Sequence, residues 1–139
     1  MYLVDTNVIS ELRKSAKQRS DKNVQAWIKS VPLDKLYTSA LCFLELEKGA
    51  LLLARHDTLQ GNALLRWMAE FVRPAFEDRV LAVDEHVASR CAPMHVPDPK
   101  SEVDALIAAT ALVHDFTVVT RNTKDFEQLG VRLLNPWKA

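Results

Sequence analysis

The sequence predicts an α/β fold, in which a mainly parallel central sheet is covered by helices on both faces. Short apolar runs rich in Val, Leu and Thr alternate with segments of helical periodicity along the whole chain. Strands separated by helices favour a parallel sheet, and right-handed crossovers bring the carboxyl ends of its strands to one edge. With 139 residues, 48% of them hydrophobic, residues 1–139 have the size of a single domain and can bury a core without disulfides.

The first half of the chain is expected to hold two strands and four helices. In order, these are a strand at 2–4, a helix at 6–14, a helix at 24–31, a strand at 36–38, a helix at 41–54 and a longer helix from 57 or 58 to about 74. Val24, Trp27, Ile28 and Val31 have the i, i+3, i+4, i+7 spacing of a helix face that packs on a core. Pro32 then ends that helix.

The two later helices of this half carry their own signals. Ser39 can cap the helix at 41–54 because its hydroxyl accepts a helix N–H. The longer helix is expected to break near residue 74, where the chain has a proline. Its side chains could serve a dimer face, but burial within one chain is the expectation. The residues expected to face the core are Leu64, Trp67, Met68 and Phe71.

The second half continues the alternation. In order, we expect a strand at 80–83, a helix at 85–95, a break at 97–100, a helix at 104–114, a strand at 117–120 and an edge strand at 132–134. The break rests on two prolines within four residues, and the strand at 117–120 on its β-branched side chains. The chain contains no internal repeats or low-complexity linkers.

Charge and cysteine content bound the possible functions. The 18 basic and 18 acidic residues give a net charge of zero, which argues against binding nucleic acid by bulk attraction. A local basic stretch from Arg13 to Lys22, which includes Lys14, Lys17 and Arg19, could still guide a polyanion, or could simply be a solvated loop.

Other residue types exclude several classes of site. Cys42 and Cys91 have no close Cys or His partner in sequence, so we expect two core thiols in a reducing compartment rather than a zinc site. The four histidines share no ligand spacing, and the three glycines form no phosphate-binding loop. No long apolar segment is present, so we expect a cytoplasmic protein that does not associate with membranes.

Four acidic residues stand at the ends of apolar runs or within helical patterns, and they are the candidate catalytic residues: Asp5, Glu45, Asp104 and Asp125. Carboxylates are hard oxygen ligands that suit Mg²⁺ or Mn²⁺, and several of them meeting would repel one another unless a divalent cation neutralised the cluster. Each also has an ordinary alternative role. Asp5 could be a helix N-cap, Glu45 a surface residue and Asp104 a first-turn acid favoured by the helix dipole.

The predicted fold says where these residues lie. Asp5 follows the first strand, and Asn122 and Asp125 follow the strand that ends at Thr120. Ligand sites of open α/β sheets lie at the edge formed by the strand carboxyl ends. Asp104 would begin the helix before that strand, and reaches the edge only if the amino end of its helix points towards the cleft.

The sequence resembles the PIN-domain family and, more narrowly, VapC-type toxins of bacterial toxin–antitoxin pairs, including the branch represented by the FitB protein. The resemblance covers the whole chain and rests on motifs in the same order and with suitable separations. The matching segments are Val4–Ser10, Ser39–Gly49 with Glu45 four residues before Gly49, Asp104–Ala111, Val119–Asn122 and Leu134–Trp137.

The resemblance implies a Rossmann-like α/β/α sandwich and a Mg²⁺-dependent endoribonuclease, with Mn²⁺ as a possible substitute. Asp5, Glu45 and Asp104 match the family's metal-binding residues. Many relatives have an aspartate where this chain has Asn122, so either Asn122 or Asp125 completes the site, with Asp125 slightly favoured. A water activated at the metal would cut RNA to leave a 5′-phosphate and a 3′-hydroxyl.

The resemblance also indicates supporting residues and partners. Residues expected to orient the carboxylates are Thr6, Asn7, Thr120 and Asn122, with surface or capping roles as the alternative for the first three. Residues expected to contact RNA phosphates are Arg13, Lys14 and Arg121. A cognate VapB-type antitoxin and a second copy of the chain are the expected protein partners.

Two alternatives from other classes stay open at this stage. In one, the chain is a catalytically silent PIN-like module that only binds RNA or protein. In the other, it is a haloacid-dehalogenase-like enzyme with Asp5 as the nucleophile. That family has a second aspartate two residues later, where this chain has Asn7.

Overall fold

The computed structural model describes residues 1–15 and 19–138. Within them lies a five-stranded sheet in the order β3-β2-β1-β4-β5, and every neighbouring pair of strands is parallel. The strands are β1 (Tyr2–Val4), β2 (Leu36–Ser39), β3 (Val80–Leu81), β4 (Thr117–Val119) and β5 (Leu133–Leu134). The predicted parallel α/β sheet is therefore confirmed.

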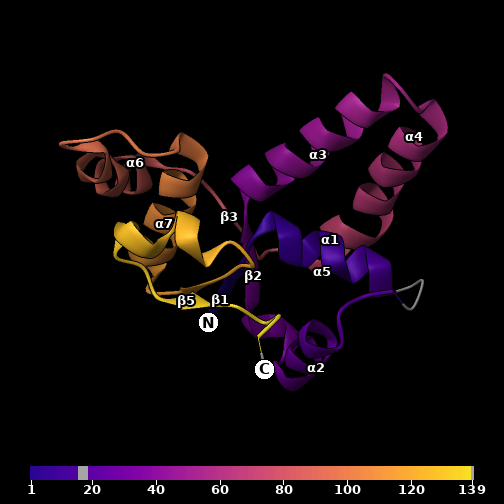
Figure 1. The fold of residues 1–139 in the computed structure, drawn as a ribbon, viewed down its shortest axis with the longest axis horizontal. Coiled ribbons are helices and arrows are strands. Elements are labelled where there is room, and N and C mark those ends of the chain that lie inside the picture. The colour runs from indigo at the N-terminus through magenta and orange to yellow at the C-terminus, as the bar shows by residue number, and fades with distance from the viewer. Residues whose placement is uncertain (16–18, 139) are drawn as a thin grey trace.

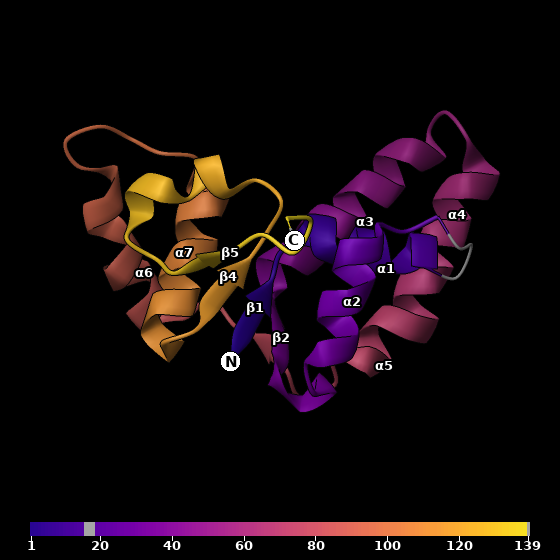
Figure 2. The same ribbon diagram turned by 60° about the horizontal axis from the view of Figure 1, so that its bottom comes forward.

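The helices cover this sheet from both sides. They are α1 (Thr6–Ser15), α2 (Lys22–Ser30), α3 (Ala40–Ala54), α4 (Thr58–Trp67), α5 (Arg73–Ala75), α6 (Glu85–Cys91) and α7 (Glu102–His114). Helices α6 and α7 pack together on one side of the sheet, and α1 and α2 lie on the other (Figures 1 and 2). The paired helices α3 and α4 extend away from the sheet (Figure 1).

The central strands are buried on both faces, so they contain continuous apolar runs rather than an alternating pattern. Leu3 and Val4 of β1 and Val118 and Val119 of β4 expose almost no surface. The register pairs Leu3 with Val118 and Val4 with Val119. This pairing fixes the two strand ends side by side, which places the residues that follow them, Asp5 and Thr120, close together.

Helices α3 and α4 each begin with a side-chain cap, of which the sequence predicts the one at Ser39. The Ser39 hydroxyl accepts the N–H of Leu41 at 3.1 Å, and the Asp57 carboxylate accepts the N–H of Gln60 at 3.0 Å. A Cβ atom at Gly61 would collide with Ala54. Glycine at this position therefore allows α4 to pack closely on α3.

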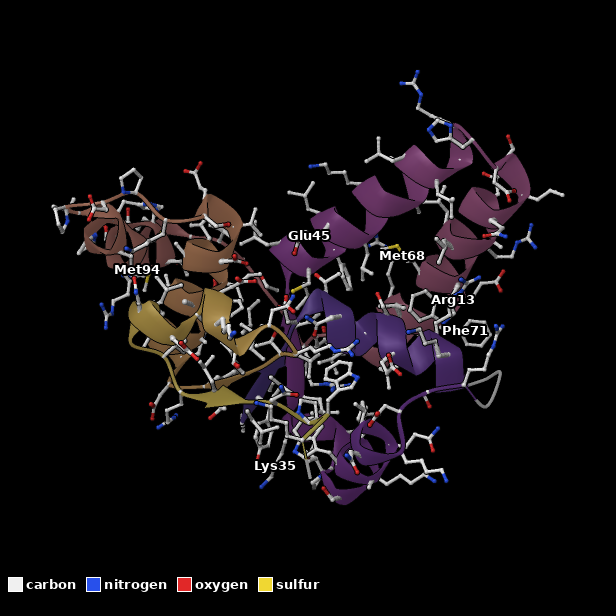
Figure 3. All side chains as sticks on the ribbon, in the orientation of Figure 1. Arg13, Lys35, Glu45, Met68, Phe71 and Met94 are labelled. Atoms are coloured by element: carbon white, nitrogen blue, oxygen red, sulfur yellow. The ribbon has the colours of Figure 1, made fainter. Side chains whose placement is uncertain are left out.

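The predicted core face of the longer helix is wrong at one residue. Met68 is buried and Leu64 and Trp67 are half-buried, but Phe71 is 64% exposed and lies on the outer side of the molecule in Figure 3. Residues Met68–Val72 form a π-helical turn. Because the wider turn shifts the phase of the residues that follow, Val72 takes the buried position that the α-helical spacing assigns to Phe71.

Several predicted bounds also differ from the observed elements. Asp104 is the third residue of α7 and not the first, because the helix begins at Glu102. The predicted helix at 85–95 ends as an α-helix at Cys91 and continues as a 3₁₀ turn from Ala92 to His95. None of the helices in the part of the chain that the structure describes is long and apolar enough to cross a membrane. Lys17, part of the predicted basic stretch, lies outside the described residues.

Candidate active site at the switch point of the sheet

The candidate site lies where the strand order of the sheet reverses. From β1 the chain adds β2 and β3 on one side, and it then returns to place β4 on the other side of β1. Ligands of open α/β sheets bind outside the strand ends at such a switch point. The backbone N–H of Asp5 donates to the carbonyl of Val119 at 2.9 Å, which joins the two segments where they leave the sheet.

A cavity of about 510 Å³ opens at this point, and all four predicted acids line it: Asp5, Glu45, Asp104 and Asp125. They come from four separate segments. Asp5 lies between β1 and α1, Glu45 in the first half of α3 (Figure 3), Asp104 in the first turn of α7, and Asp125 in the 3₁₀ turn Thr123–Asp125 after β4. The condition for Asp104 to reach the strand edge is thus met, because the amino end of α7 points towards the cavity.

Asp5 is the most buried of these acids, and both of its carboxylate oxygens have protein donors. The N–H of Thr6 donates to Oδ1 at 2.8 Å, and the hydroxyl of Thr120 donates to Oδ2 at 2.9 Å. Asp5 also begins α1 through its carbonyl, which accepts the N–H groups of Val8 and Ile9. Asp5 thus caps α1 in part, as considered from the sequence, through its backbone carbonyl and its Oδ1 atom. Its Oδ2 atom is held instead by Thr120.

The predicted orienting residues form a connected network around Asp5. The Thr120 hydroxyl accepts the side-chain N–H of Asn7 at 3.2 Å and the backbone N–H of Asn122 at 3.1 Å. The side-chain oxygen of Asn7 in turn accepts the backbone N–H of Arg121 at 3.2 Å. Because its acceptor capacity is used by Asn7 and Asn122, the Thr120 hydroxyl directs its own proton at Asp5.

Glu45 is held from α1. The Thr6 hydroxyl donates to Oε1 of Glu45 at 3.0 Å, and the rest of this carboxylate is exposed. Thr6 thus contacts two of the acids, Asp5 through its backbone and Glu45 through its side chain. The neighbouring Glu47 points elsewhere on α3 and pairs with Arg73, so it is not part of the cavity.

The surroundings in the cavity disfavour the charged forms of Asp5 and Asp104. Burial is the main cause that raises the pKa of Asp5, the hydrogen bonds from Thr6 and Thr120 oppose it, and the nearby charges of Glu45 and Asp125 add to it. Burial is also the main cause that raises the pKa of Asp104. A hydrogen bond from Ser101 lowers this pKa, and the charges of Asp125 and Asp5 raise it further. The acids are thus close enough to repel one another.

The donor set of the cavity suits a divalent cation. Within residues 1–15 and 19–138, no ion pair joins Lys or Arg to any of the four acids. No three Asp, Glu, His or Cys side chains among these residues are close enough to hold a metal ion together. Mg²⁺ nevertheless keeps several waters and is held in proteins by as few as one or two carboxylates. A cavity whose four acids are not paired with Lys or Arg therefore fits a hydrated Mg²⁺ or Mn²⁺ ion.

The three predicted RNA-binding residues lie in different places around this cavity. Lys14 and Arg121 line it, although Lys14 is paired with Glu11 at 3.3 Å. Arg13 lines an adjoining cavity of about 390 Å³ that shares Thr6 and Glu45 with the first. The basic residues thus flank the acids without neutralising them.

Three further residues line the acidic cavity and are absent from the sequence-based set: Ser10, Glu11 and Trp137. Ser10 and Glu11 follow Thr6 and Asn7 by one helical turn, so the i, i+4 spacing of polar residues on α1 was a signal that could have identified them. Glu11 is buried, and its Oε1 accepts the N–H of Asp21 at 2.8 Å. No local pattern places Trp137 there, because its position depends on the path of the chain after β5.

Comparison with known proteins assigns the chain and its fold to a family. The model of the PIN domain matches residues 2–131, and the chain belongs to the PIN-domain family. Within the family it is similar to the VapC ribonuclease Y4jK of Sinorhizobium fredii, with 37% identity, and to the toxin FitB of Neisseria gonorrhoeae, with 38% identity. Each of these alignments covers 99% of both chains.

A solved structure shows the same relationship in three dimensions. The chain superposes on a chain of the crystal structure of FitAcB from Neisseria gonorrhoeae with a TM-score of 0.87 and 35% identity, over 100% of both chains. The order of helices and strands around the site is therefore that of the FitB-like branch, as the sequence motifs predict.

Proposed function

We propose that this protein is a metal-dependent endoribonuclease and acts as the toxin of a toxin–antitoxin pair. The observation that carries the proposal is the convergence of four carboxylates from four segments on one cavity at the switch point of the sheet. Support for the substrate class and biological role comes from relatives, which are named a VapC ribonuclease and a toxin and match the chain almost end to end.

Asp5 and Asp104 would hold the metal ion directly, and Glu45 would hold it through a bound water, with Asp125 beside them. Mg²⁺, or Mn²⁺ in its place, supplies Lewis acidity, a lowered pKa of water and positive charge against the phosphate. The protein prepares the site by fixing Asp5: Thr6 and Thr120 hold its two oxygens in one orientation.

Glu45 is the best placed general base. Its carboxylate is exposed to the cavity and is fixed at one oxygen by Thr6, which leaves the other oxygen free to accept a proton from the attacking water. The water attacks phosphorus in line and the 3′-oxygen of the preceding nucleotide leaves. The products then carry a 5′-phosphate and a 3′-hydroxyl, and the 2′-hydroxyl of the RNA takes no part.

The basic residues position the RNA backbone. Arg121 lines the acidic cavity and Arg13 the adjoining one, so phosphates on either side of the cleaved bond would meet a guanidinium group. Such contacts fix the register of the substrate and carry no sequence information.

The geometry disfavours a phosphoaspartate mechanism. That chemistry needs an acid two residues after the nucleophile, and here Asn7 donates to Thr120 and accepts from Arg121. Both polar ends of its amide are thus engaged, and an amide cannot exchange a proton as an acid does. A silent binding module is also disfavoured, because uncompensated carboxylates would repel RNA phosphates.

Protein partners complete the proposal. A VapB-type antitoxin would bind the chain and block the cavity, and a second copy would form a homodimer. Exposed apolar side chains on α3, α4 and the π-helical turn offer surface for a partner, among them Leu51, Leu52, Leu59 and Phe71. Light scattering of the isolated chain tests the dimer, and co-purification with the product of an adjacent small gene tests the antitoxin.

Cleavage of end-labelled total RNA tests the catalytic proposal. With Mg²⁺ or Mn²⁺ we expect discrete fragments with 5′-phosphate ends, and none with a chelator or with Asp5→Asn. Activity that survives the chelator would remove the metal from the mechanism. Activity that survives Asp5→Asn would remove the proposed site.

A thermal melt tests metal binding without relying on activity. A ligand that binds only the folded state raises the melting temperature, and the rise grows with the ratio of the ligand concentration to its Kd. We expect Mg²⁺ to raise the melting temperature of the wild type and to have a smaller effect on Asp5→Asn and Asp104→Asn. An equal rise in all three proteins would place the ion elsewhere.

A further inference from the structure

Trp137 returns to the candidate active site after the last strand and lines the same cavity as the acids. Its backbone is held from two sides. The N–H of Trp137 donates to the side-chain oxygen of Asn135 at 2.9 Å, and its carbonyl accepts the side-chain N–H of Asn23 on α2 at 2.8 Å. The backbone of Trp137 is thus fixed at the rim of the cavity by its own turn and by a helix distant in sequence.

The indole ring is paired with Arg121. The guanidinium carbon of Arg121 lies 5.3 Å from the ring centroid, within the range of a cation–π contact. The backbone of Arg121 is also fixed, because its N–H donates to Asn7 and its carbonyl accepts the side-chain N–H of Asn135 at 3.4 Å. Asn135 therefore binds both members of the pair and sets their relative position.

A purely structural role does not account for this arrangement. Trp137 packs in part against the hydrophobic core, as a residue that covers the core would do. Yet the same side chain also lines a cavity whose other walls are mostly polar. It also contacts the guanidinium group of Arg121 beside four carboxylates. An aromatic face and a guanidinium plane next to a phosphate-cleaving centre are the two surfaces on which unpaired bases of RNA stack.

We propose that Trp137 and Arg121 form a stacking pair for one unpaired nucleobase adjacent to the cleaved phosphodiester bond, in which the guanidinium moves aside so that the base stacks on the indole ring. This inference rests on the proposed ribonuclease function and names the form of its substrate. The cavity of about 510 Å³ is of ordinary size for a small-molecule site, so it can admit a base that has left its helical stack. Bases within a duplex are not available for such stacking, so the substrate is single-stranded RNA, a loop or a bulge.

The test measures binding to short fluorescein-labelled single-stranded RNAs, one complete and the others with an abasic residue at each position in turn. All proteins carry Glu45→Gln so that the RNA stays intact. We expect one abasic position to weaken binding by roughly 10-fold or more, in line with the stacking of one base on an aromatic ring. Trp137→Leu should remove this dependence and Trp137→Phe should retain most of it. Trp27→Phe is the matched control, because Trp27 packs on Tyr2 and does not line the acidic cavity.

A second measurement keeps Trp137 intact and so does not depend on how its substitutions fold. In a Trp27→Phe, Trp67→Phe protein, Trp137 is the remaining tryptophan. Complete RNA should quench its fluorescence, and RNA abasic at the sensitive position should not. Equal binding of all RNAs, an unchanged abasic profile in Trp137→Leu, or no quenching would each overturn the stacking pair.

The two proposals fail in different ways. RNA that is cleaved without any dependence of binding on a base would leave the ribonuclease intact and remove the stacking pair. Base-dependent binding that Trp137→Leu abolishes, in a wild-type protein that cleaves no RNA, would keep the stacking pair and remove the ribonuclease. A wild-type protein that binds a protein partner through Trp137 but no RNA would overturn both.

Discussion

The hydroxyl of Thr120 lies 2.9 Å from a carboxylate oxygen of Asp5, although 115 positions separate the two residues in the chain. Their contact follows from the sheet, because β1 and β4 pair in parallel and end side by side. Strand pairing thus supplies the buried carboxylate with its donor. Hydrogen bonds to charged groups are stronger than those between neutral groups, so this contact is a good point at which to test the site.

Replacing Thr120 with valine removes this donor with little change in shape. We expect kcat/KM for RNA cleavage to fall by about 10- to 100-fold, as it does when groups that orient metal ligands are lost. Thr110→Val is the matched control, because Thr110 is equally buried but its hydroxyl bonds only to the Leu106 carbonyl within α7. The same loss in both variants would assign the effect to general destabilisation.

Glu45 and Glu47 lie on the same helix and allow a paired test of the general base. Glu45→Gln keeps the volume but cannot accept the proton of the attacking water, so we expect kcat to fall by about 10²- to 10⁴-fold. Glu47→Gln breaks only an exposed pair with Arg73, which contributes about 0–1 kcal/mol to stability, and should leave kcat unchanged. Single-turnover cleavage measures both. Comparable rates for the two variants would exclude Glu45 as the base.

The two candidates for the fourth position differ in their contacts. Both Asn122 and Asp125 line the cavity, but Asn122 contacts Thr120 through its backbone N–H, whereas the charge of Asp125 reaches Asp5 and Asp104. We expect Asp125→Asn to weaken Mg²⁺ binding by about 10-fold or more, in the range seen when supporting residues of metal sites are removed. Asn122→Ala should change it little. Calorimetric titration decides between them, and the reverse order would make Asn122 the ligand.

The raised pKa of Asp5 gives a signed prediction for stability. A carboxyl with a higher pKa in the folded state binds more protons when folded, so the free energy of unfolding falls as pH rises from the ordinary 3.8 through the raised value. The wild type should therefore lose stability relative to Asp5→Asn across this interval. The raised pKa of the partly exposed Asp104 adds little to this difference, because Asp104 titrates in both proteins.

Urea unfolding midpoints measured from acidic to neutral pH, without divalent ions, check this prediction. Saturating Mg²⁺ serves as the control, because a bound cation favours the charged carboxylates and should reduce or reverse the difference. A wild type that gains stability over Asp5→Asn as pH rises would show that the folded protein stabilises the charged form of Asp5.

Much of this architecture could be read from the sequence. Apolar runs such as Tyr2–Val4 and Thr117–Val119 are buried on both faces, so their patterns predict strands without any knowledge of their partners. Asp5 and Thr120 follow those runs directly, and the rule for parallel sheets then places them together. The position of Phe71 was wrong because a π-helical turn is a change of phase that the α-helical spacing does not contain.

The remaining features needed the three-dimensional structure. Glu45 is the sixth residue of α3, and whether it reaches the cavity depends on the direction in which α3 leaves the sheet. Trp137 lies in a turn after the last strand, and side-chain amides from Asn23 and Asn135 decide where it lies. Contacts between distant segments of this kind have no local signature in the sequence.

The scattering of the site over four segments has a consequence for the synthesis of the protein. Asp5 is synthesised before Asp104, Asp125 and Trp137, and the sheet edge can form only when β4 inserts beside β1. A nascent chain therefore carries no complete site until β4 and the segment that follows it have left the ribosome. Before that point the four acids belong to separate segments, and the chain cannot cleave RNA by the proposed mechanism.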